Sequence, residues 1–121
     1  MKKILIIEDE AIILLGTLNL LRQNGFDVIT AKDGQAGVEL AKEFLPDLIL
    51  CNIRLPRLRG DEVYKELQND PNTTEIPFIF ITAQNTSVEI ERLRKLGAKN
   101  FLIKPYLSQE LLQAIAKILG Y

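Results

Sequence analysis

Five polar residues in this sequence occupy positions where they could act together chemically. Each stands at or directly after the end of a short apolar run: Glu8, Asp9, Asn52, Thr82 and Lys104. Carboxylates supply the hard oxygen ligands that Mg²⁺ prefers. Phosphoryl transfer depends mainly on positioning and charge neutralisation, which a metal, a hydroxyl and an ammonium can provide. The set therefore indicates metal-assisted phosphoryl chemistry, provided that the fold brings these residues together.

Each of these residues also has an ordinary structural interpretation. Glu8 and Asp9 could stabilise the N-terminus of a following helix, where negative charge is favourable. Thr82 could simply end a strand, and Lys104 could be a solvated lysine before Pro105. Their joint occurrence at these spacings favours the functional interpretation.

Five apolar runs alternate with five segments of helical length and periodicity. The runs are too continuous for strands with one solvated face, so they predict buried parallel strands at 3–7, 27–31, 47–51, 78–81 and 100–103. The predicted helices are 11–23, 35–44, 61–68, 88–96 and 109–119. Strict alternation predicts one α/β domain over residues 1–121, with a doubly wound parallel sheet and right-handed crossovers. In such sheets the functional crevice lies beyond the carboxyl ends of the strands.

Local signals mark several of the element boundaries. Gly25 and Gly97 follow helical segments and predict C-terminal stops. Ser108 is a plausible N-cap for the last helix.

Composition excludes several classes of protein. The chain has 121 residues, 47% of them apolar and 26% charged, as in ordinary globular domains. A net charge of −1 gives no indication of a nucleic-acid or membrane surface. The absence of histidine excludes histidine-based catalysis, and the single cysteine, Cys51, excludes a disulfide framework and is expected to be buried. No apolar run is long enough to span a membrane, and a cytoplasmic protein is the simplest expectation.

Five motifs, in this order and spacing, resemble the receiver domain of a two-component response regulator, over residues 3 to about 119. They are Ile-Ile-Glu-Asp-Glu (6–10), Pro-Asp-Leu-Ile-Leu-Cys-Asn-Ile (46–53), Leu-Pro-Arg-Leu-Arg-Gly (55–60), Ile-Thr-Ala (81–83) and Gly-Ala-Lys-Asn-Phe-Leu-Ile-Lys-Pro-Tyr (97–106). The resemblance implies a flavodoxin-like fold with strand order 2-1-3-4-5. It also implies a non-enzymatic module of a phosphorelay, whose partner is a histidine kinase or a phosphotransfer protein.

The resemblance also implies a role for each candidate residue. Glu8 and Asp9 match the acidic pair that binds Mg²⁺ together with the phosphoacceptor and a backbone carbonyl, here that of Arg54. Asn52 stands at the phosphoacceptor position. Thr82 matches the switch hydroxyl.

Two further positions complete the match. Lys104 matches the lysine that contacts the phosphoryl group or the acceptor carboxylate, and the bond to Pro105 is expected to be cis. Phe101 matches the aromatic residue that moves inward when the site is occupied.

Three residues near the site depart from the family pattern: Asn52, Arg54 and Arg59. The family's phosphoacceptor is an aspartate, and an amide does not accept the phosphoryl group. We therefore expect no phosphorylation and weak Mg²⁺ binding, with Arg54 or Lys104 paired to the acidic residues and function through docking. The asparagine could be natural, or it could replace the aspartate of an ordinary phospho-accepting receiver altered for study. The domain could also be a phosphorylation-independent interaction module.

Other classes of protein with a functional site at the strand ends fit this sequence less well. A haloacid-dehalogenase-like phosphatase needs Asp-x-Asp, whereas residues 52–54 are Asn-Ile-Arg. A flavodoxin needs a hydroxyl-rich phosphate loop after the first strand, where this chain has Glu-Asp-Glu. The sequence also lacks a P-loop.

Two surfaces are candidates for partner binding. In the first helix, one apolar stripe is predicted to face the core: Ala11, Leu14, Leu15, Leu18 and Leu21. A second stripe beside it is predicted to dock a partner: Ile12, Ile13, Gly16, Asn19 and Leu20. A neighbouring domain or a dimer could instead cover this stripe, or Leu20 could turn into the core. The protein could also form a homodimer through the last two helices.

The sequence leaves open whether the chain acts alone or belongs to a longer regulator.

Overall fold

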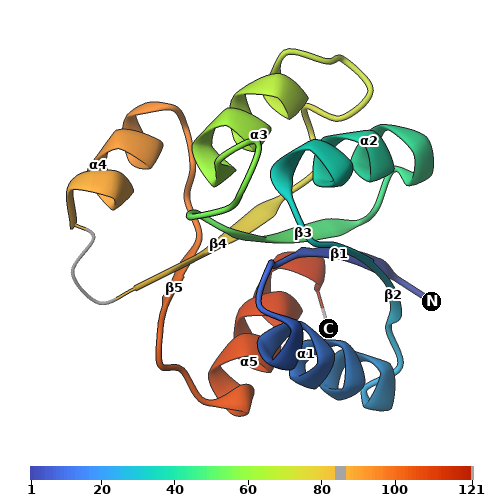
Figure 1. Cartoon of the computed structure of the whole chain (residues 1–121). Helices are drawn as coiled ribbons and strands as arrows, with labels where there is room; N and C mark the ends of the chain where they lie inside the picture. Colours follow the sequence, from blue (N-terminus) through green and yellow to red (C-terminus); the bar gives the residue numbers. More distant parts are fainter. Residues whose placement is uncertain (84–86, 121) are drawn as a thin grey trace.

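Branched apolar residues build a five-stranded parallel sheet in the computed structural model, which describes residues 1–83 and 87–120 (Figure 1). The strands are β1 (Lys3–Ile7), β2 (Asp27–Ala31), β3 (Leu48–Asn52), β4 (Phe78–Thr82) and β5 (Phe101–Ile103). Their order is β2-β1-β3-β4-β5, as expected. Both β3 and β4 are buried along their whole length, which explains why their sequences are apolar without alternation.

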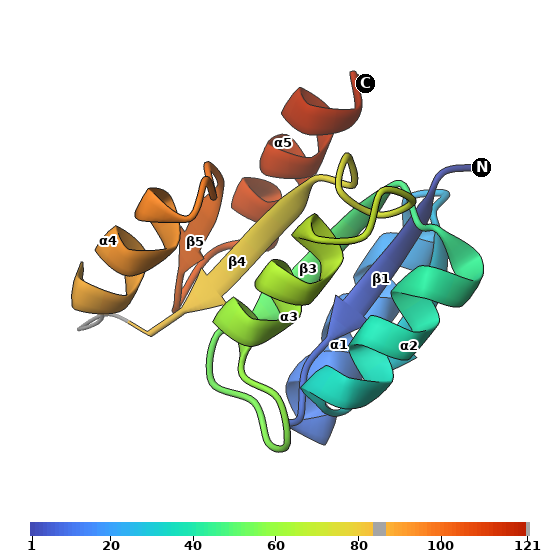
Figure 2. The ribbon, with the colours of Figure 1, turned by 90° about the horizontal axis from the view of Figure 1, so that it is seen from above.

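The helices lie on both faces of the sheet, and their bounds are α1 (Ala11–Gln23), α2 (Gly34–Phe44), α3 (Gly60–Gln68), α4 (Ser87–Lys95) and α5 (Ser108–Leu119). Figures 1 and 2 show α1 and α5 on one face, and α2, α3 and α4 toward the other. The predicted bounds agree to within one residue at each end. The shift at β3 matters most, because it makes Asn52 the last residue of the strand.

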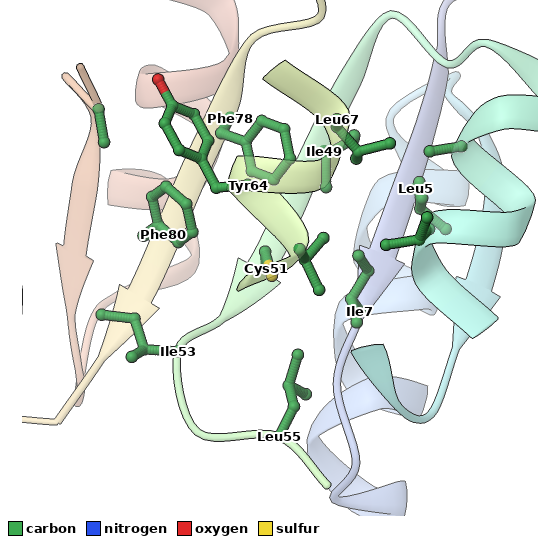
Figure 3. Close-up of a cluster of buried hydrophobic side chains, with 14 of the residues drawn as sticks. Leu5, Ile7, Ile49, Cys51, Ile53, Leu55, Tyr64, Leu67, Phe78 and Phe80 are labelled. Atoms are coloured by element: carbon green, nitrogen blue, oxygen red, sulfur yellow. The ribbon is translucent and has the colours of Figure 1, made fainter. Parts of the chain in front are cut away.

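An aromatic cluster fills the core beneath α3 and beside β4 (Figure 3). The Tyr64 ring meets those of Phe78 and Phe80 edge-on, with centroids 5.1 and 5.4 Å away, and the two phenylalanine rings stack at 5.3 Å. Cys51 belongs to the same cluster and is completely buried, as expected. Its thiol pKa is raised well above its ordinary value, first by burial and then by the nearby carboxylates of Glu8 and Asp61.

The core-facing stripe predicted for α1 is partly wrong. Leu14 and Leu21 are buried, but Ala11 and Leu15 are exposed, Leu15 by 57%. The buried helical position between the two leucines is Thr17, whose hydroxyl donates to the Ile13 carbonyl at 2.9 Å. This internal hydrogen bond satisfies the hydroxyl, so a polar residue is tolerated on the buried stripe.

The boundary predictions are mostly confirmed. Gly25 and Gly97 have φ of 86° and 109°, the left-handed conformation of a helix stop. Ser108 is not the N-cap of α5 but its first residue; Leu107 precedes it, and the Leu107 N–H donates to Glu110 Oε1 at 2.9 Å. The Lys104–Pro105 bond is cis, as expected.

Across the part of the chain that is described, no helix combines the length and apolarity needed to cross a membrane.

Gly60 allows α3 to begin directly against the end of β3. Its N–H donates to the Ile53 carbonyl at 2.8 Å, and a Cβ at this position would lie 2.5 Å from the Asn52 carbonyl oxygen. We therefore expect Gly60→Ala to lower the free energy of unfolding by about 2–3 kcal/mol, because the obstruction is backbone and has little freedom to move. Urea unfolding measures the change.

Gly16→Ala is the matched control. Gly16 is in the interior of α1, and a Cβ there would meet nothing within 4 Å. This substitution should raise the free energy of unfolding by roughly 0.5–1 kcal/mol, since alanine is the better helix former. Equal effects of the two substitutions would contradict the steric argument.

Candidate functional site

The parallel sheet brings the predicted polar residues to one rim. Glu8 directly follows β1, Asn52 and Thr82 end β3 and β4, and Lys104 directly follows β5. Backbone hydrogen bonds continue the ladder here: Lys104 N–H donates to the Thr82 carbonyl at 2.7 Å, and Ile53 N–H to the Ile81 carbonyl at 3.1 Å. A hollow of about 190 Å³ opens at this rim, lined by Glu10, Asn52, Ile53, Arg54, Ile81, Thr82, Ala83, Glu89 and Lys104.

Asn52 bridges two oxygen acceptors with its amide nitrogen. Nδ2 lies 3.1 Å from Glu8 Oε2 and 3.4 Å from the Arg54 carbonyl oxygen. Both partners only accept hydrogen bonds, so the network requires the NH₂ group on this side of the amide. The nitrogen therefore joins the acidic residue after β1 to the backbone after β3.

Glu8 is a buried carboxylate, 3% exposed, surrounded by donors. Its Oε1 lies 3.4 Å from Lys104 Nζ, and its Oε2 accepts from the Glu10 N–H at 3.2 Å as well as from Asn52. Burial raises the pKa of Glu8, and the Glu10 N–H and the Lys104 ammonium oppose that rise. The pairing of Lys104 with the acidic residues is thus as expected, through Glu8.

The three other predicted site residues differ in their exposure. Asp9 is exposed. Thr82 is 2% exposed and its hydroxyl donates to the Ala83 carbonyl at 3.4 Å. Phe101 is half-buried: its ring stacks on Phe80 at 6.0 Å, and the Arg94 guanidinium lies 5.5 Å from its centroid.

The two arginines do not approach the acidic pair, which corrects one alternative in the sequence interpretation. Arg54 Nε and Arg59 Nη2 each lie 3.6 Å from Glu89 Oε1 on α4. Arg59 Nε also contacts Asp61 Oδ1 at 3.2 Å, and Arg92 Nη2 contacts Asp61 Oδ2 at 3.3 Å. Sequence reasoning missed the roles of Glu89 and Asp61, because no motif marks them and their partners come from separate elements.

The donor set does not fit a bound Mg²⁺ well. Among residues 1–83 and 87–120, no group of three or more His, Cys, Asp or Glu side chains is placed to hold a metal ion. The Glu8 carboxylate and the Arg54 carbonyl, which could be oxygen ligands, both accept hydrogen bonds from Asn52 instead. A cation would have to displace an amide that already donates hydrogen bonds to both oxygens.

The docking stripe predicted on α1 is only partly exposed. Ile12 is 88% exposed, and Gly16 and Asn19 are also at the surface. Ile13 is half-buried and lines a hollow of about 450 Å³ with Lys104, Pro105 and Tyr106. Leu20 is half-buried and packs against the core, which agrees with the alternative that it turns inward.

Comparisons with known proteins agree with this geometry. The family model described as response regulator receiver domain matches residues 4–116. The polar-differentiation response regulator DivK of Brucella anthropi is 33% identical over 119 residues, covering 98% of this chain and 97% of DivK. The transcriptional regulatory protein PdtaR of Mycobacterium tuberculosis is 34% identical over 115 residues, covering 94% of this chain and 55% of PdtaR.

Two solved structures show the same fold. A response regulator receiver domain protein from Clostridium thermocellum has a TM-score of 0.91 at 28% identity, covering 99% of this chain and 95% of that one. The receiver domain of the sensor histidine kinase PA1611 from Pseudomonas aeruginosa has a TM-score of 0.91 at 28% identity, covering 99% of this chain and 98% of that one. In the PA1611 structure a magnesium ion is coordinated in the active-site cleft.

Sheet order, rim and motif order together define a response regulator receiver domain. The chain belongs to this family, and it is a receiver module of two-component signalling. Receiver domains generally act as signalling modules rather than enzymes. They bind Mg²⁺ in their active site and interact with histidine kinases or phosphotransfer proteins.

The buried Glu8 gives a pH dependence with a definite sign. Its folded-state pKa is raised above the ordinary value of 4.5, so the folded protein binds this proton more tightly than the unfolded chain does. Ionisation of Glu8 therefore costs stability as pH rises through the interval between those two pKa values. We expect the free energy of unfolding of the wild type, minus that of Glu8→Gln, to increase as pH falls from 7 to 4.5.

Urea unfolding of both proteins at several pH values measures this difference, in which the contributions of the other carboxylates cancel to first order. A difference that stayed constant, or that decreased on acidification, would contradict the burial argument.

Proposed function

We propose that this receiver does not accept a phosphoryl group, binds Mg²⁺ weakly and acts by docking to partner proteins. The observation that carries the proposal is the pair of hydrogen bonds from Asn52 Nδ2 to Glu8 Oε2 and the Arg54 carbonyl. An aspartate would offer an anionic oxygen as nucleophile to the phosphoryl group. Asn52 offers an amide whose nitrogen is already engaged.

The remaining residues of the rim have assigned roles in this proposal. Glu8, Asp9, Asn52 and the Arg54 carbonyl form a degenerate metal site. Thr82 and Lys104 occupy the positions that would contact phosphoryl oxygens, and Lys104 instead neutralises Glu8. We place Phe101 as the switch aromatic, in contact with both Phe80 and Arg94.

We further propose that the partner is a histidine kinase or phosphotransfer protein and that α1 receives it. The support is Ile12, whose large apolar side chain is exposed to solvent, together with the hollow lined by Ile13, Lys104, Pro105 and Tyr106. A helix of the partner would cover both. Residues 1–121 act as one cytoplasmic domain in this proposal, without enzymatic activity.

A homodimer through the last two helices is a second candidate. Ile103, on the edge strand β5 that precedes α5, is 47% exposed, and Val88 at the start of α4 is 79% exposed. Sedimentation analysis as a function of concentration tests it, and a monomer throughout would exclude it under those conditions.

The phosphorylation test uses acetyl phosphate or phosphoramidate with Mg²⁺, followed by intact mass measurement. We expect no mass increase for the wild type and the addition of one phosphoryl group to Asn52→Asp, which restores the carboxylate and leaves the rest of the rim intact. A stable phosphoryl adduct on the wild type would refute the proposal. If neither protein accepts the group, the loss extends to the surroundings of Asn52.

The docking test uses two substitutions on α1. Ile12→Glu should weaken binding to purified phosphotransfer domains from the source organism by at least about tenfold, which is about 1.4 kcal/mol. Gln23→Glu, also exposed but at the far end of α1, should leave binding unchanged. Binding is measured by calorimetry or biolayer interferometry, with circular dichroism to confirm the fold. Unchanged binding of Ile12→Glu would move the docking surface away from α1.

A further inference from the structure

The α4 helix is attached to the domain by little apolar surface. Leu93, 1% exposed, is its only buried residue in the part of the chain that the structure describes. The neighbouring helix α3 buries Val63, Tyr64 and Leu67 along with its first two residues. Hydrophobic burial scales with the apolar area removed from water, so it fixes α3 more firmly than α4. The position of α4 must therefore depend on other contacts.

Those contacts are charged and form one continuous chain. Starting at the loop after β3, Arg54 contacts Glu89 on α4, Glu89 contacts Arg59, Arg59 contacts Asp61, and Asp61 contacts Arg92 on α4. We call these five residues the α3–α4 ion-pair network. It reaches α4 at two positions almost one turn apart, and from two separate anchoring segments.

Burial makes this network stronger than a set of isolated surface pairs. Exposed ion pairs contribute little because water screens them. Here the Glu89 and Asp61 side chains are only 17% and 13% exposed. Each carboxylate is shared by two arginines, so ordering one side chain serves two contacts. The arginine side chains are 41–72% exposed.

Arg54 connects the network to the rim. Its carbonyl accepts from Asn52 Nδ2, while its guanidinium contacts Glu89. The same residue therefore meets the phosphoacceptor position through its backbone and α4 through its side chain. Figures 1 and 2 show α4 beside α3, with the turn after β3 leading into α3.

We propose that the α3–α4 ion-pair network holds α4 in one position against α3 without a phosphoryl group or a metal ion. The face formed by α4 and β5 then keeps a fixed arrangement set by the chain's own charges. This inference concerns α4 alone, and it stands or falls separately from the phosphorylation and α1 docking results.

Hydrogen exchange followed by mass spectrometry tests the proposal on Glu89→Gln. We expect exchange of the α4 amides in residues 90–95 to be at least about fivefold faster than in the wild type, with α2 unchanged. Glu91→Gln is the matched control: it makes the same change two residues along α4, at an exposed side chain that forms no ion pair in the described ranges 1–83 and 87–120. It should leave exchange unchanged.

Salt provides a second readout that loss of packing alone would not give. Raising NaCl from about 0.05 M to about 1 M shortens the screening length from roughly 14 Å to 3 Å. Wild-type α4 should then exchange faster, and Glu89→Gln should respond much less. If Glu89→Gln does not fold, the double variant Arg54→Gln, Arg59→Gln removes both contacts of Glu89 from more exposed side chains, together with the contact of Arg59 to Asp61. Equal exchange of these variants and Glu91→Gln, or salt-independent exchange of wild-type α4, would overturn the proposal.

Discussion

The rim of this domain is organised around the buried carboxylate of Glu8. A charge removed from water must be compensated by nearby donors. Three segments provide them: the Lys104 ammonium after β5, the Asn52 amide at the end of β3 and the Glu10 N–H at the start of α1. The position of Lys104 in turn depends on its backbone bond to Thr82. One carboxylate thus ties together the carboxyl ends of all the strands that form the site.

The asparagine at the end of β3 changes both the charge of the rim and its hydrogen bonds. Asparagine and aspartate have nearly the same shape, but the amide nitrogen is a donor where a carboxylate offers an acceptor. At this rim a second carboxylate beside Glu8 would add negative charge to a desolvated site, and a cation would relieve it. The amide instead pairs with Glu8 directly. In this proposal the hydrogen bonds of Asn52 take the place of a bound cation. Arg54 and Arg59 contact Glu89 on α4 rather than the acidic residues of the rim.

Much of the fold and the candidate site follows from the sequence, for identifiable reasons. Continuous apolar runs separated by helical segments determine a doubly wound sheet, and the polar residues that end those runs necessarily meet at one edge. The helix stops at Gly25 and Gly97 follow from glycine's access to positive φ.

Side-chain directions could not be predicted in the same way. Leu15 is predicted to face the core but is exposed, whereas Thr17, outside the predicted stripe, is buried and satisfies its own hydroxyl by a hydrogen bond to the Ile13 carbonyl. Arg54 could reach either the acidic pair or α4. The direction of the Arg54 side chain depends on Glu89, which is distant in the sequence and belongs to no recognisable motif.

The burial of Cys51 has a practical consequence. The thiolate is the form that reacts with alkylating reagents, and a fully buried thiol with a raised pKa provides almost none of it. Cys51 is also the only cysteine in the sequence. A single cysteine introduced on the outer side of α4, as in Glu91→Cys, would therefore be the one reactive thiol of the native protein. Fluorophores or spin labels could be attached there without first removing Cys51 from the core.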